Sequence, residues 1–171
     1  QEAAENFIPE IEAMGEENGW TPEETLKQLT AYYDGYHFCH RNMVDIFNPF
    51  SLINALADRE LRNYWASSGA TSLLPKFVDN MEMKMEYFDH CFIEGDTLET
   101  SDVVNGGAEL FLYQSGYLTI KGYDDGVYIL GFPNFEVRKA LYRVVVPALT
   151  MKSNSEVVSA QSFLRKMMQD G

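Results

Sequence analysis

The strongest structural signal in this chain is a β-hairpin at residues 117–132. Two runs rich in β-branched and aromatic residues, YLTIKGY (117–123) and VYILGF (127–132), are typical of strands. Asp124-Asp125-Gly126 lies between them, and Asp-Gly is a preferred hairpin turn because both central residues of such a turn take positive φ. The sequence therefore predicts two paired strands joined by a tight turn.

Helices are predicted on both sides of this hairpin. Residues 107–115 have helical apolar spacing and end at Ser115-Gly116, and a second helix begins at Phe135 and continues through Val145. A last helix is predicted over about 155–168. The order helix–hairpin–helix indicates a winged-helix-like module.

The N-terminal part of the chain predicts helices almost throughout. A first helix, with Phe7 and Met14 at helical spacing, is expected to end at Gly15 or Gly19. Thr21-Pro22-Glu23-Glu24 is a capping box that begins a second helix, and Asp34-Gly35 ends it.

Residues 36–47 are expected to form a loop or short extended structure. Asn48-Pro49 then begins a third helix, since Asn is a good cap and Pro suits the first turn. Another helix is predicted over 71–78, whereas residues 79–104 have no firm period and predict an irregular connector with a short helix.

The charge of the chain restricts its partners. The formal net charge is -13, and residues 1–26 contain eight Glu and no Lys or Arg. A nucleic-acid backbone would be repelled by such a surface. The basic residues Arg138, Lys139 and Arg143 are the one exception that merits a test. No apolar run approaches the ~18 residues of a membrane span.

His37, Cys39 and His40 lie close enough in sequence to suggest a zinc site. The remaining Cys and His, Cys91 and His90, are adjacent, which is poor geometry for two ligands of one ion. A loop without metal is therefore favoured. The two cysteines match no disulfide framework and predict free thiols in a reducing cytoplasm, with a single disulfide as the alternative.

Motifs for catalysis are absent from the sequence. It contains no Gly-x-Ser-x-Gly elbow, no EF-hand calcium loop and no glycine-rich phosphate-binding loop ending in Gly-Lys. With 26 acidic residues, paired carboxylates carry little information. The sequence predicts that this chain is not an enzyme by itself.

Five motifs in a fixed order resemble a known family. They are YYDGYHF (32–38), NPFSLINAL (48–56), NYWASSGATSLL (63–74), LFLYQSGYLTIKGYD (110–124) and YILGFPNFEVRKAL (128–141). Together they resemble the downstream half of bacterial AAA-ATPase-like proteins that are often followed by a PD-(D/E)XK nuclease-like domain. The resemblance extends over most of residues 7–168.

The resemblance implies a mainly α (α+β) fold in two parts. Residues 1–104 would be a helical lid-like region of the ATPase domain, and residues 105–171 would be the winged-helix-like module that leads to a further C-terminal domain. The phosphate-binding loop would lie upstream, so ATP and magnesium are expected only in a longer parent protein. The implied partners are the ATPase core and nuclease-like domain of the same chain, and the implied function is a non-catalytic module that couples nucleotide state to an attached effector. A protein- or DNA-binding module is the alternative.

The residues that carry the resemblance admit two interpretations. The favoured one is structural: a helix stop, caps and large aromatic anchors. In the other, polar residues such as Asp34, Asn48 and Ser51 face a nucleotide or partner, and Trp65 with Ser67, Ser68 and Gly69 lines a groove. The full set of signature residues is Tyr33, Asp34, Gly35, Tyr36, Asn48, Pro49, Ser51, Trp65, Gly69 and Gly116.

Overall fold

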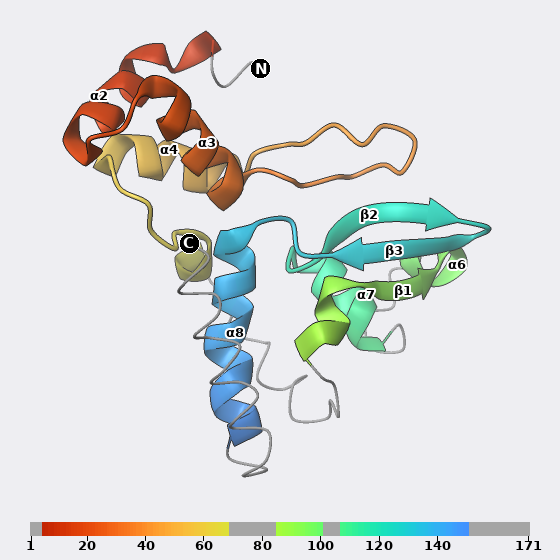
Figure 1. The fold of residues 1–171 in the computed structure, drawn as a ribbon. Coiled ribbons are helices and arrows are strands. Elements are labelled where there is room, and N and C mark those ends of the chain that lie inside the picture. The colour runs from red at the N-terminus through yellow and green to blue at the C-terminus, as the bar shows by residue number, and fades with distance from the viewer. Residues whose placement is uncertain (1–4, 69–84, 101–106, 151–171) are drawn as a thin grey trace.

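The computed structural model describes residues 5–68, 85–100 and 107–150 (Figure 1). These residues form mainly helices together with one small antiparallel sheet, which confirms the α+β class. The predicted helices over 71–78 and 155–168, and the signature residue Gly69, lie outside the described residues.

Three helices form an N-terminal helical unit, α2 (Ile8–Asn18), α3 (Pro22–Tyr33) and α4 (Pro49–Asp58). Gly15 lies inside α2, and the helix ends at Gly19, whose φ of 72° is the left-handed value that favours glycine.

The predicted caps of α3 and α4 are confirmed. The Thr21 hydroxyl accepts a hydrogen bond from the Glu24 amide, and the Glu24 carboxylate accepts one from the Thr21 amide. Asn48 Oδ1 accepts from the amides of Phe50 and Ser51, so it satisfies two donors that the first turn of α4 would otherwise leave unpaired. Residues 36–47 form the expected extended loop, closed by a bridge between Tyr36 and Ile46. We call this loop the arm.

The second half of the structure is built on a three-stranded sheet in the order β1-β3-β2. β2 (Thr119–Asp124) and β3 (Val127–Gly131) form the predicted hairpin, and Asp125 and Gly126 both have positive φ, as its turn requires. β1 (Cys91–Glu94) pairs antiparallel with β3. The connector predicted over 79–104 does contain short helices among its described residues, at 85–89 and 95–98, but the prediction missed β1. CFIE alternates buried and exposed side chains over too few residues to give a periodic signal.

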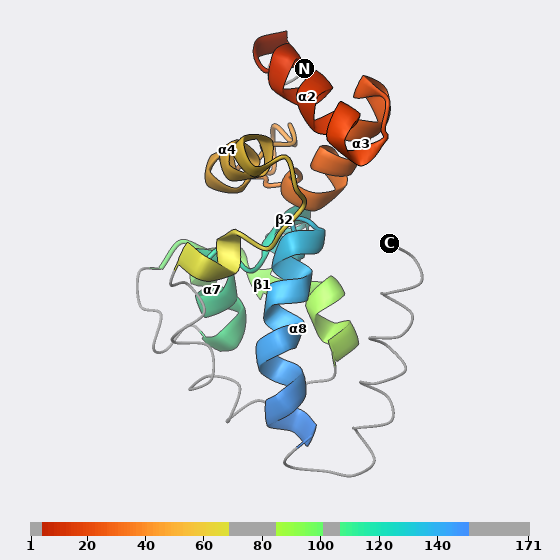
Figure 2. The same cartoon turned by 90° about the vertical axis from the view of Figure 1, so that its left-hand side faces the viewer.

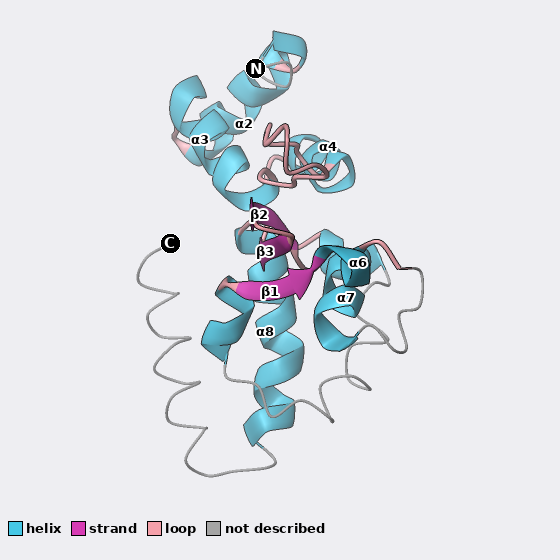
Figure 3. Ribbon diagram, turned by 90° about the vertical axis from the view of Figure 1, so that its right-hand side faces the viewer, coloured by secondary structure: helices cyan, strands magenta, loops and turns pink. Residues whose placement is uncertain are grey.

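Helices surround this sheet (Figure 3). The short helices η2 (Met85–Asp89) and α6 (Gly95–Leu98) flank β1, and α7 (Gly107–Gln114) precedes the hairpin. The long helix α8 (Phe135–Thr150) follows the hairpin. The order β1–α6–α7–β2–β3 is winged-helix-like, with one strand more than the hairpin that was predicted.

The buried apolar side chains form two clusters. One joins α2, α3 and α4 around Met14, Leu29 and Tyr33. The other is centred on the sheet, α7 and α8, and it also includes Tyr36 from the arm and Trp65 from the short helix η1 (Trp65–Ser68). The chain passes between the clusters at residues 59–64, so the contacts of this linker decide how the two parts are joined.

Candidate functional site

The linker of residues 59–64 is fastened to both parts of the molecule. The Tyr33 hydroxyl, at the end of α3, donates to the Arg62 carbonyl at 2.8 Å and accepts from the Arg62 amide at 3.1 Å. The Asn63 side chain donates to the Glu136 carbonyl at 2.9 Å. Figure 2 shows the linker descending from α4 to η1 beside the first turns of α8. We call this junction the seam.

Glu136 is the central residue of the seam. It lies in the first turn of α8 and is fully buried, and its Oε1 accepts a hydrogen bond from the Trp65 amide at 2.8 Å. Burial raises the pKa of its carboxyl group, while the Trp65 amide, the neighbouring Ser51 side chain and the Tyr64 backbone act in the opposite direction. The Glu136 side chain therefore links α8 to η1 through Oε1, while its Oε2 is buried without a hydrogen-bond partner among the described residues.

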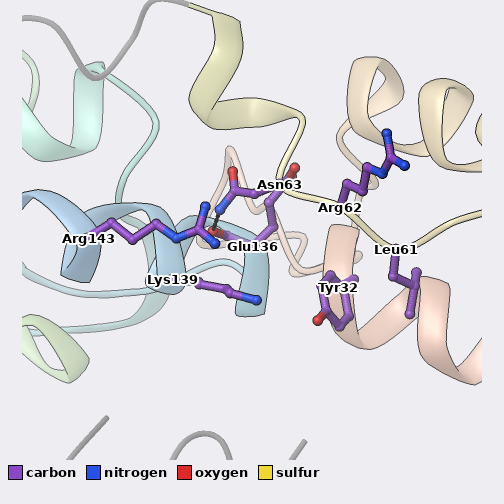
Figure 4. Close-up of a pocket in the computed structure, with 7 residues that line it drawn as sticks. All are labelled: Tyr32, Leu61, Arg62, Asn63, Glu136, Lys139 and Arg143. Carbon is purple, nitrogen blue, oxygen red and sulfur yellow. Dashed lines mark hydrogen bonds between the residues drawn. The ribbon is translucent and has the colours of Figure 1, made fainter. Parts of the chain in front are cut away.

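A pocket of about 300 Å³ opens on the outer side of the seam (Figure 4). Its walls come from three places: Tyr32 in α3, residues 61–63 of the linker, and one face of α8. The α8 residues are Glu136, Lys139 and Arg143, spaced three and four apart, which places them on the same side of the helix. The pocket exists only because the two parts meet here.

The pocket is lined by three cations in a strongly acidic chain. Arg62 is paired with Glu60 on the surface. Within the part of the chain that the structure describes, neither Lys139 nor Arg143 forms an ion pair with a carboxylate. The carboxyl group of Glu136 is engaged at the buried side of the seam, so it does not neutralise these cations by direct pairing. The arrangement suits the binding of an anion.

The donors of the suspected zinc site do not converge. His37 Nδ1 faces the Ile120 carbonyl at 2.9 Å and Nε2 faces the Asp45 carboxylate at 2.8 Å, so both ring nitrogens are occupied by acceptors. His40 Nδ1 contacts the Tyr128 hydroxyl, and its ring stacks on Tyr123. No group of three or more potential metal ligands occurs among the described residues. These contacts fasten the arm to the β2–β3 hairpin.

Both cysteines are free thiols, as predicted, and they differ in environment. Cys39 is exposed on the arm, whereas Cys91 is fully buried in β1. Burial raises the pKa of the Cys91 thiol to about 12.

The described signature residues lie behind the pocket rather than in it, and their hydrogen bonds join segments that are distant in sequence. Asn48 donates its amide to the Tyr33 carbonyl, and Tyr36 donates its hydroxyl to the Gly116 carbonyl at 3.2 Å. Asp34 accepts from the Gly35 amide at 2.8 Å, and burial raises the pKa of its carboxyl group.

The remaining signature positions fill the same region. Ser51 is fully buried, and Pro49 occupies the first turn of α4. The Trp65 ring packs edge-on against Tyr117, and Gly116 takes a φ of 81° beside it. The set therefore holds the seam together.

The sequence did not single out Glu136, and it did not predict that the residues lining the pocket come together. Glu136 stands in the motif NFEVRKAL as one of 26 acidic residues, and only its position in the first turn of a helix distinguishes it. Lys139 and Arg143 were noticed as bases, but Tyr32 and Arg62 reach them only through the fold.

A second surface feature is a strip of exposed apolar side chains. We call the exposed apolar side chains of the arm and of α4 together the strip; they are Phe38 (68%), Met43, Val44 (60%), Ile46, Phe50 and Ile53 (55%). Isolated exposed apolar residues are common, but a group of this kind marks an interaction surface.

No protein-family model matches the chain, and no solved structure matches it. The chain is similar to an uncharacterised protein encoded in the vnfD 5′ region of Azotobacter chroococcum mcd 1, with 25% identity over 141 residues that cover 76% of this chain. The chain spans about a quarter (27%) of the length of that relative. Within the described residues, no helix has the length and apolar character needed to cross a membrane.

Proposed function

We propose that this chain is a non-catalytic lid and regulatory module of a longer bacterial AAA-ATPase-like protein, where it couples nucleotide state to an attached nuclease-like domain. ATP and magnesium would be bound by the rest of the parent, in the cytoplasm, where Cys39 and Cys91 would remain reduced. The ordered motifs support this family, and the similarity to one quarter of a longer protein is consistent with a module.

The observation that carries the proposal is the apolar strip on the arm and α4. A lid must present a surface to the domain that it covers, and burying a large apolar side chain stabilises a contact by about 1.5–3 kcal/mol. Several such side chains, among them Phe38, Val44 and Ile53, are more than half exposed. Contact with a neighbouring protein domain would therefore be more favourable for the strip than exposure to water.

The seam supports the regulatory part of the proposal. The strip belongs to the arm and α4, while the winged-helix-like module leads toward the C-terminal end of the chain. Tyr33, Asn63 and Glu136 fasten the two parts through hydrogen bonds at 2.8–3.1 Å. A movement of the helical unit would thus be transmitted to α8.

The test uses the complete protein from the same gene. Val44→Asp and Ile53→Asp would each place a charge in the contact and are expected to alter ATP turnover of the complete protein and to increase protease cleavage between its domains. Phe92→Asp is the matched control, because Phe92 is equally exposed (60%) but lies on β1, away from the strip. Unchanged turnover and cleavage in both strip variants would refute the lid proposal, as would ATP hydrolysis by the 171-residue chain that point mutations within it abolish.

The alternative function is a protein- or DNA-binding role of the winged-helix-like module, and the element order β1–α6–α7–β2–β3 favours it. The charges favour a protein partner over DNA. Helix α7 contains Glu109 and no base, and the hairpin turn contains Asp124 and Asp125. Duplex DNA binding at micromolar affinity and physiological salt, with a steep salt dependence, would support the DNA-binding alternative instead.

A further inference from the structure

We propose that the pocket at the seam is a binding site for a phosphate group, either inorganic phosphate or the phosphate of a small phosphate ester, with Lys139 and Arg143 as its principal ligands. The binding step does not depend on the lid proposal. A regulatory role of the bound phosphate does rest on the lid proposal, because the ligand would contact both parts of the module.

The first argument is electrostatic. Lys139 and Arg143 project from one face of α8 into the same pocket (Figure 4), and among the described residues no carboxylate pairs with either of them. Arg59 pairs with Glu17 and Arg138 with Asp89, whereas Lys27 and Arg41, like the two α8 bases, form no ion pair among the described residues. Lys139 and Arg143 are distinguished by lining the same pocket. Lys139 Nζ lies over the Phe135 ring, 5.8 Å from its centre, but no carboxylate among the described residues neutralises either charge. Two cations that line one pocket attract an anion, and Arg binds phosphate through two parallel hydrogen bonds.

The second argument concerns the one acidic residue in the wall. Glu136 would oppose an anion if its carboxylate faced the pocket as a free charge. Instead Oε1 accepts the Trp65 amide, the side chain is fully buried, and burial raises the pKa of the carboxyl group. Its backbone carbonyl is occupied by the Asn63 amide. Glu136 therefore forms part of the wall without pairing directly with Lys139 or Arg143.

The third argument is the size and composition of the pocket. A volume of about 300 Å³ exceeds what a lone phosphate needs and leaves room for an attached organic group. Tyr32 supplies an aromatic side chain on the α3 side, and Arg62 lines the pocket from the linker while its guanidinium, paired with Glu60, points away from Lys139 and Arg143 (Figure 4). A bound phosphate ester would therefore bridge α3, the linker and α8.

The test is a titration of the 171-residue chain with inorganic phosphate, pyrophosphate and AMP at low ionic strength, followed by ³¹P NMR and isothermal titration calorimetry. We expect saturable binding that weakens about tenfold in Lys139→Gln and in Arg143→Gln, equivalent to the loss of about 1.4 kcal/mol. Lys27→Gln is the matched control, since it makes the same change of charge at an exposed position of α3 outside the pocket. Circular dichroism of each variant verifies folding.

The three probes distinguish the two sources of phosphate. If AMP binds more tightly than inorganic phosphate and Tyr32→Leu removes that advantage, the ligand is a phosphate ester with a ring; equal binding of both identifies inorganic phosphate. Absence of binding by all three probes, or equal weakening in Lys27→Gln, would overturn the site. Phosphate binding by this chain, with no effect of either Val44→Asp or Ile53→Asp on the complete protein, would retain the site and refute the lid.

Discussion

Gly35→Ala is expected to destabilise the protein through two separate effects. Gly35 has a φ of 96°, and a side chain in the left-handed region costs about 1–2 kcal/mol. An added Cβ would also lie 2.3 Å from the Pro133 carbonyl oxygen, which is a backbone atom and cannot rotate away. Overpacking of this kind typically costs about 1–3 kcal/mol, so the total expected loss of unfolding free energy is about 2–5 kcal/mol.

A matched variant separates the two effects. Gly19→Ala introduces the same methyl group at a φ of 72° with nothing within 4 Å, so it carries the backbone cost alone. The reduced entropy of the unfolded chain is common to both variants and cancels in the comparison. We therefore expect Gly35→Ala to lose about 1–3 kcal/mol more than Gly19→Ala, the range of the overpacking cost.

The measurement is urea and thermal unfolding followed by circular dichroism and Trp fluorescence. A difference of about 2 kcal/mol corresponds to about 4–8 °C in Tm for a chain of this size. Equal losses of unfolding free energy in the two variants would refute the reasoning, because they would mean that the close approach of Gly35 to Pro133 does not constrain the fold.

Three further predictions concern single residues. Glu136→Gln keeps an acceptor for the Trp65 amide and removes a group whose folded pKa is raised. Such a group makes the folded state bind more protons than the unfolded state, so wild-type stability falls as pH rises above about 4.5. In urea unfolding at pH 4–8 the variant should show a smaller fall, since the raised pKa of Asp34 still contributes, and parallel pH profiles of the two proteins would contradict the prediction. Asn48→Ala removes the α4 cap and should lower the unfolding free energy by about 0.5–2 kcal/mol in the same assay. Asn54→Ala, which removes an exposed hydrogen bond within α4, is the control and should have less effect. An unchanged unfolding free energy for Asn48→Ala would show that the cap is dispensable. A thiol reagent should modify Cys39 rapidly and Cys91 only on unfolding, and chelator dialysis should leave no zinc; stoichiometric retained zinc would restore the metal site around Cys39.

Local signals in the sequence were sufficient for most helices and for the hairpin. The capping box at Thr21, the Asn48-Pro49 start and the Asp125-Gly126 turn each act over a few residues, so they are readable without the fold. Strand β1 was missed because four residues with no turn signal do not distinguish a strand from a connector, and its pairing with β3 is decided 35 or so residues further along the chain.

The candidate site could not be predicted for a related reason. Tyr32, Arg62 and Arg143 come from a helix, a linker and a second helix, and each is unremarkable within its own segment. The resemblance drew attention to residues such as Tyr36 and Trp65, which are buried behind the pocket. Sequence signatures of this kind report the residues that hold a junction together, while the ligand-facing residues depend on how the junction closes.

The arm and Gly35, the residue before it, also cover an edge of the β-sheet that could otherwise pair with another copy of the protein. β2 is at the end of the sheet, where an open strand could pair with another chain. The arm covers that side: the His37 backbone exchanges hydrogen bonds with the Thr119 hydroxyl at 2.7 and 2.8 Å, the His37 ring reaches the Ile120 carbonyl, and Lys121 donates to the Gly35 carbonyl. The opposite end is protected by the brevity of β1, only four residues long. The contacts of Gly35 and His37 thus protect the β2 edge against edge-to-edge aggregation, and their loss is expected to lower the solubility of the protein first.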